Sequence, residues 1–113
     1  MERSRKELRD AVATTPAGVF RIRNRATGRC LIHASTNLPA VESRLAFALA
    51  SQSLAAIDQR LVTDVKASGL GALEFTVMER LERRPGGDAA EFRAELDALA
   101  DLVREGHDPD ELY

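Results

Sequence analysis

The stretch GVFRIRNRATGRCLIHASTN, residues 18–37, decides the fold of this 113-residue chain. Its first part alternates apolar side chains with arginines, which is the period-2 pattern of a half-buried strand. NRATG then supplies turn residues, and residues 29–34 return as a second strand. Alternate side chains of this second strand lie on opposite faces, with Cys30, Ile32 and Ala34 on one and Leu31 and His33 on the other. The stretch therefore predicts a β-hairpin.

Helical and strand patterns alternate after the hairpin. STN offers helix N-caps, Pro39 suits a first helical turn, and Gly69 is a helix stop. The predicted elements are helices over residues 39–50 and 53–67, a third strand over residues 73–79, and a last helix over residues 89–105. The order strand, strand, helix, helix, strand, helix predicts a small α+β fold, in which helices cover a sheet.

The length of the chain predicts a single domain with flanking segments. Residues 1–15 form a charged N-terminal segment, in which residues 3–13 can make a short leading helix. Residues 16–106 form the domain, and residues 107–113 are expected to be a loose acidic tail. No long apolar run predicts a membrane span, and Cys30, as the lone cysteine, excludes an internal disulfide, so we expect a cytoplasmic protein without membrane association.

The net charge of −2 conceals an asymmetry along the chain. Residues 1–29 hold eight Lys/Arg against three Asp/Glu, whereas residues 86–113 hold two against nine. A basic front end is suited to nucleic acid, and an acidic end repels it or holds a cation. Pairing of the two ends, or simple solvation of both, explains the same asymmetry without a ligand.

The hairpin and the segments after it resemble a GIY-YIG nuclease domain. That family opens with Gly-Ile/Val-Tyr, passes a basic-polar turn with NG or TG, and continues with Tyr-Ile/Val-Gly and then SS or ST, Asn and Leu. The matching letters here are Gly18-Val19-Phe20, Thr27-Gly28-Arg29, Leu31-Ile32-His33 and Ser35-Thr36-Asn37-Leu38. The similarity covers about residues 16–82, including RLAFAL and LEFTVMERLE, and extends loosely to residues 88–105. It implies a three-stranded antiparallel sheet flanked by helices, and a phosphodiesterase that uses one divalent metal.

The catalytic positions that the resemblance implies are substituted in this chain. The family's tyrosines position or deprotonate the attacking water, and an arginine stabilises the phosphate charge. Phe20 occupies the first tyrosine slot, Leu31 the second, and His33 replaces the glycine of the YIG motif. The arginine slot falls on Val41 or Glu42, with Arg44 nearby. Loss of both hydroxyls and of the arginine implies impaired or lost hydrolysis.

Only the metal carboxylate of the family has an acidic counterpart here. The resemblance places it at Glu95, or at Glu91 because the last helix aligns in two ways. An active member would need Mg²⁺ or Mn²⁺ at this position, and an inactive member would need no cofactor. His33 adds a group that could act as a base near neutral pH or as a single metal ligand, although a hydrogen-bonded or exposed histidine is the commoner role.

Arginines of the hairpin are the candidate nucleic-acid ligands. Arg21, Arg23, Arg25 and Arg29 could contact successive phosphates, or they could form the solvated face of the hairpin. Three hypotheses follow. The chain is a DNA-binding GIY-YIG-like domain with impaired or lost phosphodiesterase activity, an active metal-dependent endonuclease with substituted groups, or a protein-interaction module with an apolar cleft. A basic surface over the cleft favours the first two, and an acidic last helix shielding the cleft favours the third.

Overall fold

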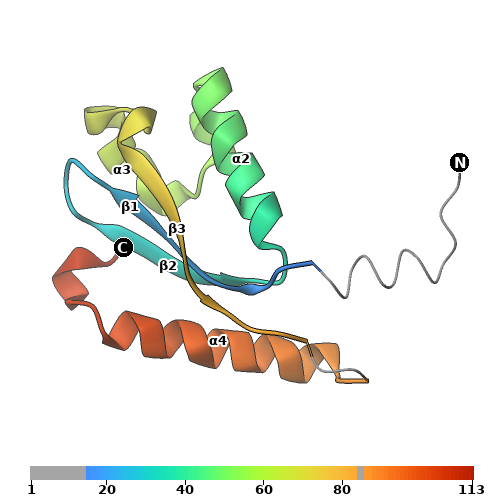
Figure 1. Cartoon of the computed structure of the whole chain (residues 1–113). Coiled ribbons are helices and arrows are strands. Elements are labelled where there is room, and N and C mark those ends of the chain that lie inside the picture. Colours follow the sequence, from blue (N-terminus) through green and yellow to red (C-terminus); the bar gives the residue numbers. More distant parts are fainter. Residues whose placement is uncertain (1–14, 84–85) are drawn as a thin grey trace, which may run out of the picture.

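A computed structural model describes residues 15–83 and 86–113, so the helix predicted over residues 3–13 lies outside the described residues (Figure 1). The strands are β1 (Gly18–Asn24), β2 (Cys30–Ser35) and β3 (Leu73–Arg80), and the helices are α2 (Leu38–Ser51), α3 (Gln59–Ser68) and α4 (Ala89–Glu105). Three short 3-10 helices are η1 (Leu54–Ala56), η2 (Leu70–Ala72) and η3 (Pro109–Glu111). In this part of the chain no helix is long and apolar enough to cross a membrane.

The three strands form one antiparallel sheet in the order β2-β1-β3. The hairpin register places Phe20 opposite His33 and Arg21 opposite Ile32. On the other side of β1, the register with β3 shifts between Val19 and Phe20, which marks a β-bulge. The predicted α+β class, with a three-stranded antiparallel sheet and flanking helices, is therefore confirmed.

The sheet lies between α4 on one face and α2 with α3 on the other (Figure 1). Each face of the sheet contributes to a hydrophobic core. Helices α2 and α3 cover one face, where β1 and β2 contribute Phe20, Ile22 and Leu31. Helix α4 covers the other face, where Leu96 and Ala100 pack on Val19, Cys30, Ile32 and Ala34. The division of β2 into these two faces is the one that its alternating pattern predicts.

Local signals set most of the helix ends. The Asn37 side chain accepts a hydrogen bond from the backbone N–H of Ala40 and starts α2. Gly69, with φ of 86°, ends α3 at the predicted stop. One expectation is wrong: residues 53–67 do not form a continuous helix. Ile57 is extended, and the Asp58 carboxylate accepts from the backbone N–H of Arg60, so α3 starts anew after η1.

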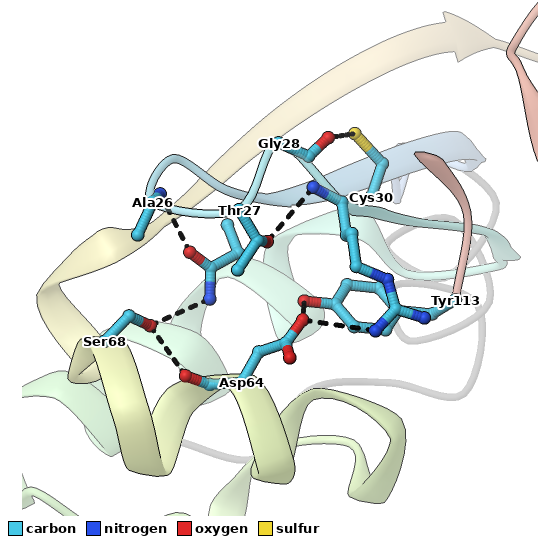
Figure 2. Close-up of polar contacts among 9 residues, drawn as sticks. Ala26, Thr27, Gly28, Cys30, Asp64, Ser68 and Tyr113 are labelled. Atoms are coloured by element: carbon cyan, nitrogen blue, oxygen red, sulfur yellow. Dashed lines mark hydrogen bonds and ion pairs between the residues drawn. The ribbon is translucent and has the colours of Figure 1, made fainter. Parts of the chain in front are cut away.

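The C-terminal segment, residues 107–113, is packed against the domain and is not the loose tail that the sequence predicts. Leu112 forms a parallel bridge with Cys30, and the backbone N–H of Tyr113 donates to the Cys30 carbonyl at 3.0 Å. The Tyr113 hydroxyl donates to Asp64 Oδ2 at 2.6 Å (Figure 2). This docking has a physical cause, since β2 is an edge strand whose outward carbonyls need donors.

Candidate functional site

A cavity of about 700 Å³ lies between the hairpin strands and the α2–η1–α3 segment. Its volume falls in the range of ligand-binding pockets. Apolar side chains dominate the lining, and polar groups are few: His33, Ser35, Arg44, Asp58 and Arg60. An apolar cavity with a small set of polar groups is the usual form of a binding site.

Four positions that the sequence singled out as catalytic meet in this cavity, namely Phe20, Leu31, His33 and Arg44. Phe20 and Leu31 are 7% and 3% exposed, so they line it from within the core. The Phe20 ring also stacks on Phe75, with centroids 5.8 Å apart. The positions equated with tyrosine slots therefore supply apolar surface and no hydroxyl.

Asp58 and Arg60 are site residues that sequence reasoning missed. Nε of Arg60 donates to Asp58 Oδ1 at 3.0 Å, and Nη2 donates to Oδ2 at 2.9 Å, which makes a bidentate pair. This hydrogen bonding lowers the pKa of Asp58 and raises the pKa of Arg60. The signal in the sequence was the Asp-x-Arg spacing after Ile57, which the apolar period of an apparently continuous helix obscured.

His33 is half-buried at the cavity and surrounded mainly by cations. Burial is the largest cause that lowers its pKa, and the charges of Arg60, Arg104 and Arg93 lower it further, while Asp58 opposes them. The imidazole is therefore neutral at neutral pH. It can accept or donate a hydrogen bond there, but it contributes no positive charge.

Among the charged side chains that line the cavity, that of Arg44 makes the fewest polar contacts. Its side chain is exposed on α2, and it forms no ion pair or hydrogen bond with another residue of the described ranges. Arg60, in contrast, is paired with Asp58. The rim of the cavity thus has two guanidinium groups and one carboxylate, a net positive charge that suits an anionic ligand.

A smaller recess of about 120 Å³ adjoins the cavity along the outer edge of β2. The two hollows share Leu31, His33 and Arg60. The recess adds Arg104, whose Nε donates to the Ile32 carbonyl at 2.9 Å and whose Nη1 contacts Asp101 at 2.7 Å. Cationic groups therefore extend from the cavity along the β2 edge.

The four hairpin arginines do not form a common surface. Arg21 and Arg23 alternate with Phe20 and Ile22, so they lie on the α4 side of the sheet, away from the cavity. Arg25 Nη2 donates to the Gly71 carbonyl at 2.6 Å.

Arg29, at the base of the hairpin turn, is held by the C-terminal segment and α3. Its guanidinium lies 4.4 Å from the centre of the Tyr113 ring, and its Nη1 is 3.4 Å from Asp64 Oδ2. These contacts have a structural role, because they connect the hairpin to elements distant in sequence. A phosphate ligand would have to compete with them for Arg29.

Glu95 is not brought together with the other predicted site residues. It is exposed on α4, which packs on the face of the sheet opposite the cavity, and Glu91 lies on the same helix. The cavity has Asp58 as its carboxylate, and Arg60 occupies both oxygens of that group. Across residues 15–83 and 86–113, no group of three or more His, Cys, Asp or Glu side chains could hold a metal ion. The donor set of the cavity therefore does not fit a single Mg²⁺ or Mn²⁺ ion.

Searches against protein-family models, curated proteins and solved structures found no match to this chain. An apolar cavity with cationic groups at its rim can bind a ligand that combines an anionic group with an apolar or aromatic part. The last helix does not shield the cavity, because it packs on the opposite face.

Proposed function

We propose that this protein is a GIY-YIG-like domain that binds DNA at its cavity and has lost the ordinary phosphodiesterase chemistry. The observation that carries the proposal is the convergence of Phe20, Leu31, His33 and Arg44 on one cavity. Phe20, Leu31 and His33 were chosen from motif spacing, and Arg44 was chosen because it lies near the arginine slot, which falls on Val41 or Glu42. The four residues come from two strands and a helix. The antiparallel sheet between two helical layers supports the same proposal.

Binding of DNA is assigned to the rim of the cavity and not to the hairpin arginines. Arg44 has a guanidinium available to a phosphate, and Arg60 is held in a fixed orientation by Asp58. Guanidinium groups bind phosphate oxygens with charge-assisted hydrogen bonds and release counterions from DNA. Arg104, in the adjoining recess, extends this cationic surface along β2.

Loss of hydrolysis follows from the groups at the same positions. Phe20 and Leu31 offer no hydroxyl that could position or deprotonate water, and Asp58 is occupied by Arg60. Neutral His33 could still accept a proton, but Glu95 lies on the other face of the sheet. The remaining groups are therefore suited to binding a phosphate and poorly suited to activating water against it.

The binding part is tested with Arg44→Gln, and with Arg23→Gln as the matched control on the α4 side of the sheet. We expect Arg44→Gln to weaken DNA binding about tenfold, and to reduce the slope of log K against log salt by about 0.7 to 0.9, as loss of one phosphate contact does. Fluorescence anisotropy at several salt concentrations measures both. If Arg23→Gln weakens binding and Arg44→Gln does not, the binding surface lies on the other face and the assignment to the cavity is wrong.

The catalytic part is tested by incubating the protein with single-stranded, branched and duplex DNA in the presence of Mg²⁺ or Mn²⁺. We expect the DNA to remain intact while it is bound. Cleavage by the wild-type protein that disappears in Glu95→Ala would show that hydrolysis persists with a metal held at α4.

A further inference from the structure

Phe47 is an exposed aromatic residue at the rim of the cavity. Its side chain is 62% exposed, and it lies three residues after Arg44 on α2. Residues at this spacing lie on the same side of a helix, so the ring and the guanidinium are neighbours. The other large exposed apolar side chain in the described part of the chain is Leu102, which lies on α4 away from the cavity.

An aromatic ring beside cationic groups is the combination that binds single-stranded nucleic acid. Bases stack on exposed aromatic side chains, while arginines contact the backbone phosphates. In a duplex the base faces are already stacked on one another, so a ring at a cavity rim has access only to an unpaired base. The apolar side chains that line the cavity together with Phe47 suit the flat face of a base better than a phosphate.

We propose that the cavity binds an unpaired nucleotide of a DNA strand, with its base stacked on Phe47 and its phosphate at Arg44 and Arg60. This inference rests on the proposed DNA-binding function and adds the substrate class, single-stranded in preference to duplex. In this proposal the strand continues from the cavity into the neighbouring recess, which Arg60 and Arg104 both line. His33, neutral and shared by both hollows, offers a hydrogen bond to the base or the sugar.

The test compares the affinities of a short fluorescein-labelled oligothymidylate and of a blunt-ended DNA duplex with the same total number of nucleotides, in which every base is paired. We expect the oligothymidylate to bind more tightly. Phe47→Ala should weaken binding of the oligothymidylate about tenfold, as loss of one base-stacking contact does, and should leave binding of the duplex unchanged. Phe47→Trp should keep the affinity, and Phe47→Leu, which retains apolar surface without an aromatic face, should lose most of it.

Leu102→Ala is the matched control, because it removes an equally exposed apolar side chain from the opposite face. Circular dichroism of each variant checks that the fold is retained. Equal affinity for the two DNAs, or an unchanged oligothymidylate affinity in Phe47→Ala while Arg44→Gln weakens binding, would overturn this inference and leave the proposed function standing. If neither DNA binds, the proposed function fails together with the inference, and the apolar cavity becomes a site for a protein partner.

Discussion

Gly18 shows how a single residue constrains the sheet. It opens β1 next to the β-bulge, where β1 and β3 approach each other closely. A Cβ atom at this position would overlap the backbone carbonyl oxygen of Glu79 and would come within 2.9 Å of the Arg80 Cα. Backbone atoms of a neighbouring strand cannot move aside as the end of a flexible side chain can. Glycine at position 18 is therefore required by close packing of the strands.

We expect Gly18→Ala to lower the free energy of unfolding by about 2 kcal/mol or more, because the strands must separate to admit the methyl group. Urea denaturation followed by circular dichroism measures the change. Gly71→Ala is the control, since a Cβ at Gly71 has no atom within 4 Å and its φ is not positive. Equal stability of the two variants would show that β1 and β3 are less closely packed at Gly18.

At the scale of elements, the docked C-terminal segment connects the edge of β2 to α3. Tyr113 makes this connection: its backbone N–H donates to the Cys30 carbonyl, and its hydroxyl donates to Asp64 (Figure 2). Burial, followed by the hydrogen bond to Asp64, raises the pKa of Tyr113 to about 12. The raised pKa means that docking favours the protonated phenol. The resulting stabilisation is complete below pH 10 and is lost as the pH rises through about 12.

Ultraviolet titration can test the docking directly, because Tyr113 is the single tyrosine and the chain has no tryptophan. We expect its ionisation midpoint near 12. Asp64→Asn removes the carboxylate that disfavours the phenolate, so it should lower the midpoint. Burial, the larger cause, persists in this variant, so the midpoint should stay above that of free tyrosine. A wild-type midpoint near 10 would contradict the docking.

At the scale of the whole molecule, one three-stranded sheet supports two cores. Leu61 lies at the centre of the core under α2 and α3, and Leu96 at the centre of the core under α4, both with 0% exposure. Because β1 and β2 contribute side chains to both cores, loss of packing on one face also weakens the support of the other. This arrangement predicts that the two faces unfold together.

We expect Leu61→Ala and Leu96→Ala each to lower the free energy of unfolding by about 2 to 5 kcal/mol, the range for a buried leucine replaced by alanine. In both variants, the helical circular dichroism and the Tyr113 fluorescence should change in a single coincident transition. Early loss of helical signal in Leu96→Ala, with the Tyr113 fluorescence retained, would instead show that α4 unfolds independently of the other face.

Local sequence signals predicted a large part of this fold. Alternation in the hairpin assigns Leu31 and Cys30 to opposite faces, Asn37 caps α2, and Gly69 ends α3. These features depend on neighbours along the chain, because side-chain alternation, capping and left-handed backbone are properties of a few consecutive residues. The motif spacing also selected Phe20 and the other slot positions that line the cavity.

Local sequence signals could not predict where the charged and aromatic side chains lie relative to the sheet. Asp64 and Tyr113 are 49 residues apart in sequence. Arg60 reaches the cavity because the helical conformation is interrupted at Ile57 and α3 begins anew after Asp58. Glu95 was assigned to a site from which α4 is separated by the whole sheet. Helical periodicity predicts which face of a helix is buried, but it does not predict the element against which that face packs. The packing partner is determined by the arrangement of all elements together. Local patterns thus determined the strands, the caps and the apolar lining, whereas long-range packing determined which cations surround the cavity.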